Sequence, residues 1–300
     1  MASPVFSPRT PFGRIATAMI TPFTADGALD LDGAQALAAQ LVEAGNDALV
    51  VSGTTGESPT TTDEEKAALV RAVVEAVGDR ARVVAGVGTN DTRHSVEQAQ
   101  TAEKAGAHAL LAVTPYYSRP PGEGVYRHFV AIADATGLPL MLYDIPVRTS
   151  TPIDTETLVR LAEHERIVAV KDAKGDLGAS SWVMARTDLA YYCGDDMLNL
   201  PLLAIGAVGA VSVASHLVTP DIRAMFDAYG AGEVEKARDI HRSLLPVYTG
   251  VFRTQGVITT KAALRALGRP AGPVRLPLVD LTPEQFAVLR RDLAQSGIEI

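Results

Sequence analysis

The stretch "DALVVSGTTGESPTTTDEEKAALVRAVVEAVGDRARVVAGV", residues 47–87, contains one complete strand, loop, helix and strand. The runs "DALVV" (47–51) and "RVVAGV" (82–87) predict two short buried strands. The residues between them predict a helix with Thr62 as the N-cap, Glu65 at the third helical position and Gly78 as the stop. Because strands joined through a helix run parallel, this stretch predicts one unit of a parallel α/β sheet.

The same unit recurs along the chain. Eight short runs of Val, Ile, Leu and Ala, each followed by a loop and a helical pattern, lie at 15–20, 47–51, 82–87, 109–113, 138–143, 167–171, 189–193 and 209–213. They are apolar on both faces, as parallel strands covered by helices must be. We therefore predict a (β/α)8 TIM barrel, whose active site would lie at the carboxyl ends of the strands. An open doubly wound sheet is the alternative, but the sequence has neither a G-x-G-x-x-G turn nor a P-loop.

Three further helical patterns follow the last predicted strand, near 219–229, 232–247 and 282–296. One of them is needed as the eighth helix of the barrel, and the others predict a helical extension. We expect residues 1–230 to form the barrel that carries the active site, and residues 231–300 to form the C-terminal extension.

The composition excludes some partners. Apolar residues make up 47% of the chain, which allows a sizeable core, and the net charge of −8 is spread along the sequence. Nucleic acids and anionic membranes both require a basic face, so we expect neither as a partner. The single cysteine, Cys193, cannot form an internal disulfide, which predicts a reducing, cytoplasmic location.

Two segments bear on membrane targeting. The N-terminal "MASPVFSPRTPFG" has no apolar run long enough for a signal peptide. Residues 197–220 carry no Asp, Glu, Lys or Arg and are long enough to span a bilayer, but Asn199, Pro201 and His216 interrupt them. We predict a short helix in "NLPLLAIGA" and a strand in "AVSVA" instead, both buried in the fold.

Polar residues gather where the predicted strands end. The second, fourth, fifth and sixth strands run into segments that contain Thr54, Thr55, Tyr116, Tyr117, Tyr143, Arg148 and Lys171. On a barrel these segments all face the same mouth. The sequence therefore predicts one site that combines a lysine with phenols, hydroxyls and a guanidinium group.

This set of groups suits imine chemistry. A lysine attacks a ketone only as the free amine, and at its ordinary pKa fewer than about one in a thousand is neutral at pH 7. Burial of Lys171 in an apolar barrel would supply that amine, and phenols and hydroxyls would carry the protons. The "GTTGE" turn offers backbone N–H groups and hydroxyls to one carboxylate. Arg148 offers a two-pronged contact to a second carboxylate.

Each residue alone also fits a structural role. Lys171 could pair with Asp172, Thr54 and Thr55 could bond their own turn, the tyrosine pair could pack at a rim, and Arg148 could lie on the surface. Their convergence on one mouth of the barrel favours a functional site over these separate structural roles. No His or carboxylate cluster has the spacing of metal ligands, so we expect neither a metal nor a cofactor.

Five motifs resemble those of a known family. "GTTGESPTTTDEE", "VTPYYSRPP", "YDIPVRT", "VKDAKGDL" and "YYCGDDMLNLP" are similar to the motifs of the pyruvate-dependent class I aldolases of the dihydrodipicolinate synthase and N-acetylneuraminate lyase family, in the form found in actinobacteria. The resemblance runs from about residue 12 to the end of the chain. It implies a lyase that condenses pyruvate with L-aspartate 4-semialdehyde to 4-hydroxy-tetrahydrodipicolinate, in lysine and diaminopimelate biosynthesis.

The resemblance also implies catalytic roles for residues at the strand ends. Lys171 would form the Schiff base with pyruvate, and Tyr143 would donate and accept protons beside it. A relay would link Tyr143 through Thr54 to Tyr117. In the family this last tyrosine enters from the neighbouring subunit, so the resemblance implies at least a dimer and usually a homotetramer.

Substrate binding follows from the same resemblance. Thr55 and the backbone of Val211 would bind pyruvate. Arg148 would hold the carboxylate of aspartate semialdehyde.

The chain departs from the family pattern at four positions. Asp144 stands where Asn is frequent, and Ser150 stands where Gly is frequent. Lysine-inhibited members carry a histidine at the position of Lys66 and a glutamate at that of His94, so we expect weak or no inhibition by lysine.

Two other functions compete with this reading. A lyase or dehydratase for sugar acids would also use Lys171, but members with such substrates usually lack an arginine at position 148. A catalytically idle barrel with a binding or regulatory role is the third hypothesis.

Overall fold

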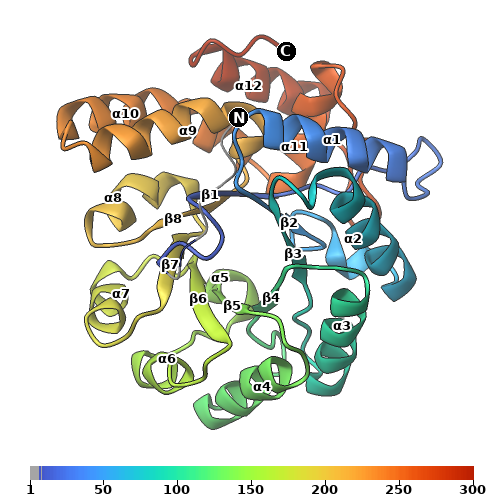
Figure 1. Cartoon of the computed structure of the whole chain (residues 1–300). Coiled ribbons are helices and arrows are strands. Elements are labelled where there is room, and N and C mark those ends of the chain that lie inside the picture. The colour runs from blue at the N-terminus through green and yellow to red at the C-terminus, as the bar shows by residue number, and fades with distance from the viewer. Residues whose placement is uncertain (1–6, 8) are drawn as a thin grey trace.

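The computed structural model describes residues 7 and 9–300. Most of the N-terminal segment on which the expectation about a signal peptide rests lies outside these residues. Eight parallel strands form a closed barrel, in which each strand pairs with the next and β8 pairs with β1 (Figure 1). The strands are β1 (Ile15–Ala18), β2 (Ala48–Val51), β3 (Arg82–Gly86), β4 (Ala109–Val113), β5 (Leu140–Asp144), β6 (Ile167–Asp172), β7 (Ala190–Cys193) and β8 (Gly209–Ser212).

Helices surround this barrel, as Figure 1 shows in a view along its axis. They are α1 (Leu31–Glu43), α2 (Asp63–Val77), α3 (Thr92–Lys104), α4 (Gly122–Asp134), α6 (Thr155–Leu161), α7 (Leu177–Met184), α8 (Asn199–Ala204) and α9 (Ser215–Gly230). Nearly every residue of the strands is buried, because side chains fill the barrel on one face and helices cover the other. The predicted fold class is therefore confirmed, and the predicted strands agree with the observed ones to within two residues at each end.

The predicted start of α2 is also confirmed. Thr62 accepts a hydrogen bond from the backbone N–H of Glu65, and the Glu65 side chain accepts one from the backbone N–H of Thr62. This reciprocal capping box satisfies two N–H groups that a helix end leaves without partners. Gly78 follows the last residue of the helix, as predicted.

The segment 197–220 is folded into the barrel. Its residues belong to the 3-10 turn η2 (Asp196–Leu198), to α8, to β8 and to the first part of α9. Among the helices formed by residues 7 and 9–300, none has both the length and the apolar character that a membrane crossing needs.

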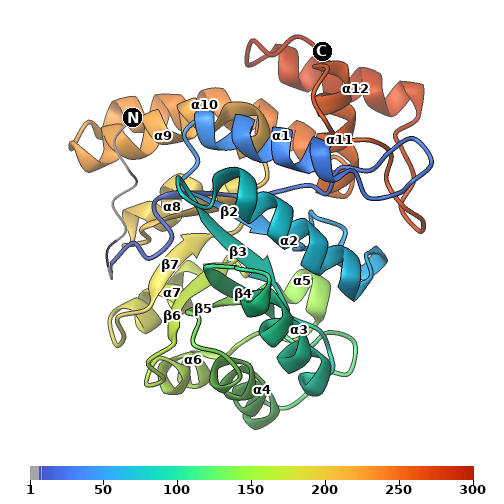
Figure 2. The ribbon, with the colours of Figure 1, turned by 45° about the vertical axis from the view of Figure 1, so that its right-hand side comes forward.

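Three helices follow α9, namely α10 (Val234–Val251), α11 (Gly256–Ala266) and α12 (Pro283–Ala294). Figure 2 shows them stacked beyond the barrel on the side of α1, where α10 packs against both α9 and α12. The sequence did not predict α11, because the β-branched run Ile258–Thr260 gives a weak helical signal. This helix is nevertheless buried on most of its surface, so packing rather than propensity stabilises it.

Candidate active site

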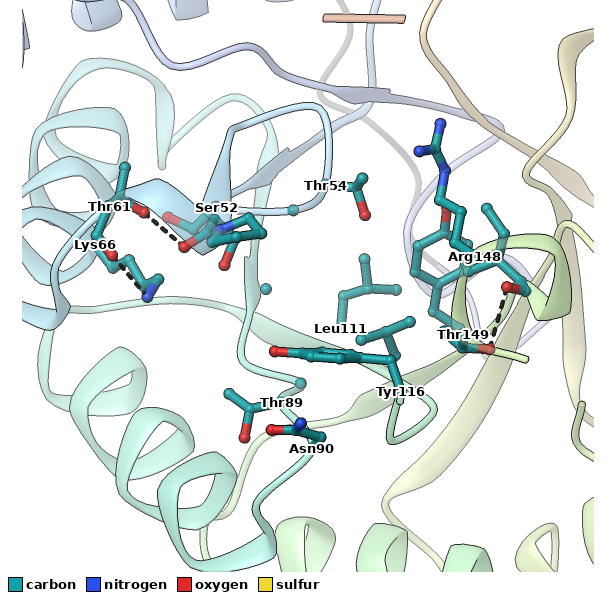
Figure 3. A pocket seen from close by; sticks show the side chains of 18 of the residues that line it. Ser52, Thr54, Thr61, Lys66, Thr89, Asn90, Leu111, Tyr116, Arg148 and Thr149 are labelled. Carbon is teal, nitrogen blue, oxygen red and sulfur yellow. Dashed lines mark hydrogen bonds between the residues drawn. The ribbon is translucent and has the colours of Figure 1, made fainter. Parts of the chain in front are cut away.

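A cavity of about 450 Å³ opens where β2, β3, β4 and β5 end (Figure 3). This volume suits a small metabolite. Of the predicted site residues, Thr54, Tyr143 and Arg148 line the cavity. Lys171, Thr55, Val211 and Tyr117 do not belong to the described residues that line it.

Lys171 and Tyr143 lie side by side on neighbouring strands. The register of β5 and β6 places Tyr143 opposite Lys171, and both side chains are buried. The Lys171 Nζ atom lies 4.1 Å from the centre of the Tyr143 ring. Tyr143 also lines the cavity, so the amine lies next to one of the residues of the cavity wall.

The surroundings of Lys171 favour its neutral form. Burial lowers the pKa of Lys171 to about 8, although the carboxylate of Asp196 opposes this effect and Arg148 adds to it. At pH 7 about one amine in ten is then free, far more than in an exposed lysine. The alternative pairing with Asp172 is not seen, because that carboxylate accepts hydrogen bonds from the Ser180 hydroxyl and the Lys174 backbone.

Tyr143 keeps its proton at neutral pH. Burial raises its pKa to about 12, although the positive charge of Arg148 and hydrogen bonding to Thr54 both act in the opposite direction. A protonated phenol beside an amine can donate its proton to a departing oxygen and take one back.

The "GTTGE" turn follows β2 directly. Thr54 lines the cavity, while Thr55 is buried with 8% of its surface exposed. Val211 lies fully buried inside β8, across the barrel closure from β1.

Arg148 lies in the short helix α5 (Pro146–Thr149), at the rim of the cavity (Figure 3). The neighbouring Thr149 fixes this turn, because its hydroxyl accepts a hydrogen bond from Thr114 at 3.0 Å and donates one to Ile145 at 3.2 Å. The Arg148 guanidinium forms no ion pair with any residue in the described part of the chain. It is thus available to an anionic ligand.

Tyr117 is separated from the other predicted residues. Its side chain is 91% exposed, and its backbone has a left-handed φ of 72°. A non-glycine residue rarely adopts this conformation. Within one chain, therefore, the structure does not bring Tyr117 to Thr54 and Tyr143.

Two residues after β7 were missed by the sequence analysis. A Cβ atom at Gly194 would lie 3.0 Å from both Cγ and Cε of Lys171, so a side chain there would displace the lysine. The buried carboxylate of Asp196 accepts hydrogen bonds from the backbone of Val213 and Ala214, just beyond β8. The motif "YYCGDD" contained this signal, since a glycine and two acids directly follow an apolar strand.

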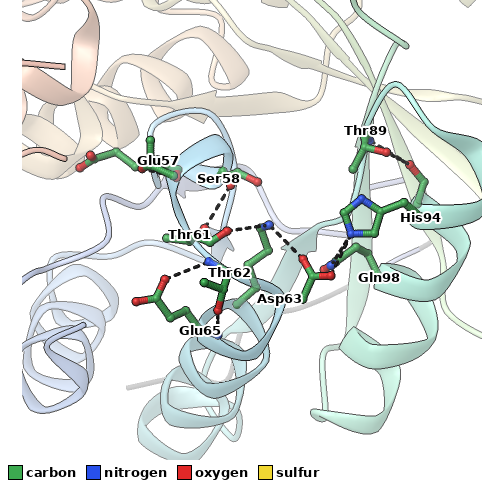
Figure 4. A network of polar contacts seen from close by, with 12 residues as sticks. Glu57, Ser58, Thr61, Thr62, Asp63, Glu65, Thr89, His94 and Gln98 are labelled. Atoms are coloured by element: carbon green, nitrogen blue, oxygen red, sulfur yellow. Dashed lines mark hydrogen bonds and ion pairs between the residues drawn. The ribbon is translucent and has the colours of Figure 1, made fainter. Parts of the chain in front are cut away.

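One wall of the cavity carries a separate charged cluster, shown in Figure 4. Asp63 contacts the Lys66 ammonium at 3.5 Å and the His94 ring at 2.9 Å. Partial burial raises the pKa of Asp63, but His94 and Lys66 together outweigh this effect and leave the pKa below its usual value. Tyr116 and Asn90 line the same cavity.

A parallel eight-stranded barrel with a buried amine beside a phenol, at the carboxyl ends of the strands, is typical of barrel enzymes that act through a lysine. The model of the dihydrodipicolinate synthetase family matches residues 11–296, and the chain belongs to this family.

Named relatives agree with this assignment. The chain is 70% identical over 298 residues to 4-hydroxy-tetrahydrodipicolinate synthase 2 of Streptomyces coelicolor, covering 99% of this chain and 100% of the relative. It is also 70% identical to the 4-hydroxy-tetrahydrodipicolinate synthase of Acidothermus cellulolyticus, covering 96% and 93% of the two chains. The crystal structure of the Cyanidioschyzon merolae enzyme with lysine bound shares 44% identity and a TM-score of 0.94, covering 96% and 99% of the two chains.

Proposed function

We propose that this chain is a lyase that condenses pyruvate with L-aspartate 4-semialdehyde to 4-hydroxy-tetrahydrodipicolinate, a step of lysine and diaminopimelate biosynthesis. The observation that carries the proposal is the buried Lys171 beside Tyr143, in a chain that matches a synthase of that name over its full length at 70% identity. The single buried cysteine supports a cytoplasmic location.

The first half of the reaction uses the amine. Neutral Nζ of Lys171 attacks C2 of pyruvate and forms a C–N bond. The carbonyl oxygen takes up two protons, one lost by Nζ and one donated by the phenol of Tyr143, and it leaves as water to yield an iminium ion. The positive iminium then favours loss of a proton from C3 to the Tyr143 phenolate, which gives an enamine and restores the phenol.

The second half consumes the aldehyde. C3 of the enamine attacks C4 of aspartate semialdehyde, and the aldehyde oxygen takes up a proton to become the 4-hydroxyl group. The amino group of this substrate then attacks C2 and displaces Nζ, which closes the ring and regenerates the free lysine. The two substrates together lose one water molecule, and no oxidant or metal enters the balance.

The other site residues bind the two substrates and relay protons. Thr55 and the backbone of Val211 bind pyruvate, and Arg148 binds the carboxylate of the aldehyde substrate. The unpaired guanidinium at the cavity rim supports this role, and it favours the synthase over a lyase for sugar acids. Tyr117 completes the proton relay through Thr54 from a neighbouring subunit, so we propose a homotetramer built from dimers. The exposed Tyr117 side chain supports this assembly.

Borohydride reduction tests the proposal. With pyruvate present, peptide mapping should find a reduced adduct on Lys171, and added aspartate semialdehyde should give the product in the absence of borohydride. An adduct on another lysine, or no adduct, would refute the mechanism. Product formation from sugar acids alone would favour the alternative function.

A further inference from the structure

The turn that carries Thr54 and Thr55 ends in a strained, buried acid. Glu57 has a left-handed φ of 55° and is only 2% exposed. A non-glycine residue in this conformation has to be held there by its surroundings. A buried carboxylate likewise requires a partner. Both requirements are met by residues that lie more than two hundred positions further along the chain.

Lys261 supplies the countercharge. It lies in α11, is completely buried, and places Nζ 2.6 Å from Oε1 of Glu57. The same ammonium donates a hydrogen bond to the carbonyl of Pro273 at 2.8 Å. It also lies 4.1 Å from the centre of the Phe23 ring. A lysine buried among so many specific partners has a defined position.

Arg275 contacts residues 57–65 at both ends of this segment. Its backbone N–H donates to Oε2 of Glu57 at 2.9 Å, and its guanidinium carbon lies 4.0 Å from the centre of the Phe23 ring. The guanidinium also donates to the carbonyl of Thr60 and forms a two-pronged ion pair with Glu65 at 2.6 and 2.7 Å. Figure 4 shows Glu57 and Glu65 at the two ends of this segment. Residues 57–65 are therefore fixed at both ends by the C-terminal extension.

We propose that Lys261 and Arg275 are positioning residues, which hold the turn 53–57 in the conformation that presents the Thr55 hydroxyl to pyruvate and the Thr54 hydroxyl to the proton relay. This inference rests on the proposed function, because it assigns those hydroxyls to the pyruvate reaction. The C-terminal extension is then part of the active-site machinery, although none of its described residues lines the cavity. Loss of the countercharge leaves Glu57 buried without its ammonium partner, and the strained turn can then relax toward solvent.

The test compares Lys261→Met and Arg275→Met with Arg253→Met. Arg253 is a matched control, because it forms an ion pair with Asp292 of α12 inside the extension and contacts neither the turn nor Glu57. For each protein, steady-state rates give kcat and both KM values, borohydride trapping gives the pyruvate concentration at half-saturation, and thermal unfolding gives Tm.

In Lys261→Met, the pyruvate KM and the half-saturation of trapping should both rise by about tenfold, the effect of one well-placed hydrogen bond. The KM of the aldehyde, which binds at Arg148, should change by less than about threefold. Arg275→Met should raise the pyruvate KM by at least about threefold. In Arg253→Met the pyruvate KM should stay within about twofold even if Tm falls.

If Lys261→Met does not fold, the double variant Glu57→Gln with Lys261→Met replaces it, since removing both charges avoids an unpaired buried ion. It should show the same rise in pyruvate KM. An unchanged half-saturation of trapping in a folded variant, or an equal change in Arg253→Met, would overturn the positioning role alone. Failure of the wild-type protein to form any adduct would overturn the proposed function as well.

Discussion

Replacing Lys171 by Met should abolish turnover and yet make the protein more stable. Burial holds the pKa of Lys171 at about 8, whereas the unfolded chain has the ordinary value of 10.5. At pH 7 the unfolded chain thus binds the proton more tightly, which costs the folded state about 3 kcal/mol. Methionine has a similar unbranched shape and no charge, so it should fill the same space beside Tyr143 without this cost.

The pH dependence follows from the same two pKa values. Below pH 8 lysine is mostly charged in both states, and the full cost is present. Between pH 8 and 10.5 only the unfolded chain is charged, so the stability of the wild-type protein rises with pH relative to the variant. The advantage of Lys171→Met should therefore fall to roughly half near pH 9.5 and vanish above about pH 10.5.

Thermal unfolding at a fixed protein concentration measures this difference. At pH 7 the Tm of Lys171→Met should exceed that of the wild type by roughly 5 °C. The surface variant Lys236→Met is the control, since its ion pair with Glu233 is exposed and its loss should change stability by no more than about 0.5 kcal/mol. A Tm of Lys171→Met equal to or below that of the wild type at pH 7 would show that burial does not penalise this ammonium.

Three further predictions concern the other residues of the cavity. Tyr143→Phe and Thr54→Val should each lower kcat by roughly 10² to 10⁴ and leave the fold intact, as circular dichroism would verify, and an unchanged kcat would remove that residue from the proton relay. Arg148→Ala should reduce kcat/KM for aspartate semialdehyde by the equivalent of roughly 1.5 to 3 kcal/mol while the pyruvate adduct still forms, and equal loss of both would place Arg148 elsewhere. Lysine should inhibit weakly or not at all, because Asp63 is already engaged by two basic side chains, Lys66 and His94, and the ammonium of free lysine would meet like charge. Half-inhibition at sub-millimolar lysine would contradict this assignment.

The sequence by itself determined the barrel, because its signals are local. Apolar runs of four to six residues, a capping box at Thr62 and a stop at Gly78 all act within a few residues of where they stand. Once these elements were placed, the rule that active sites lie at the carboxyl ends of barrel strands brought Lys171 and Tyr143 to one mouth. The structure places them on adjacent strands in direct register.

Only the tertiary structure decided the relations between distant residues. The ion pair of Glu57 with Lys261 joins positions that are far apart in the sequence, and no local pattern indicates that the two residues are partners. The tight fit around position 194 appears only when the Lys171 side chain is seen 3.0 Å from where a Cβ atom would lie. Helix α11 was missed for the same reason, since its β-branched residues gain their helical state from burial against the rest of the extension. Local propensity is a property of each short segment of sequence. Close packing and charge pairing depend on which segments come into contact, and these contacts are fixed only when the whole fold has formed.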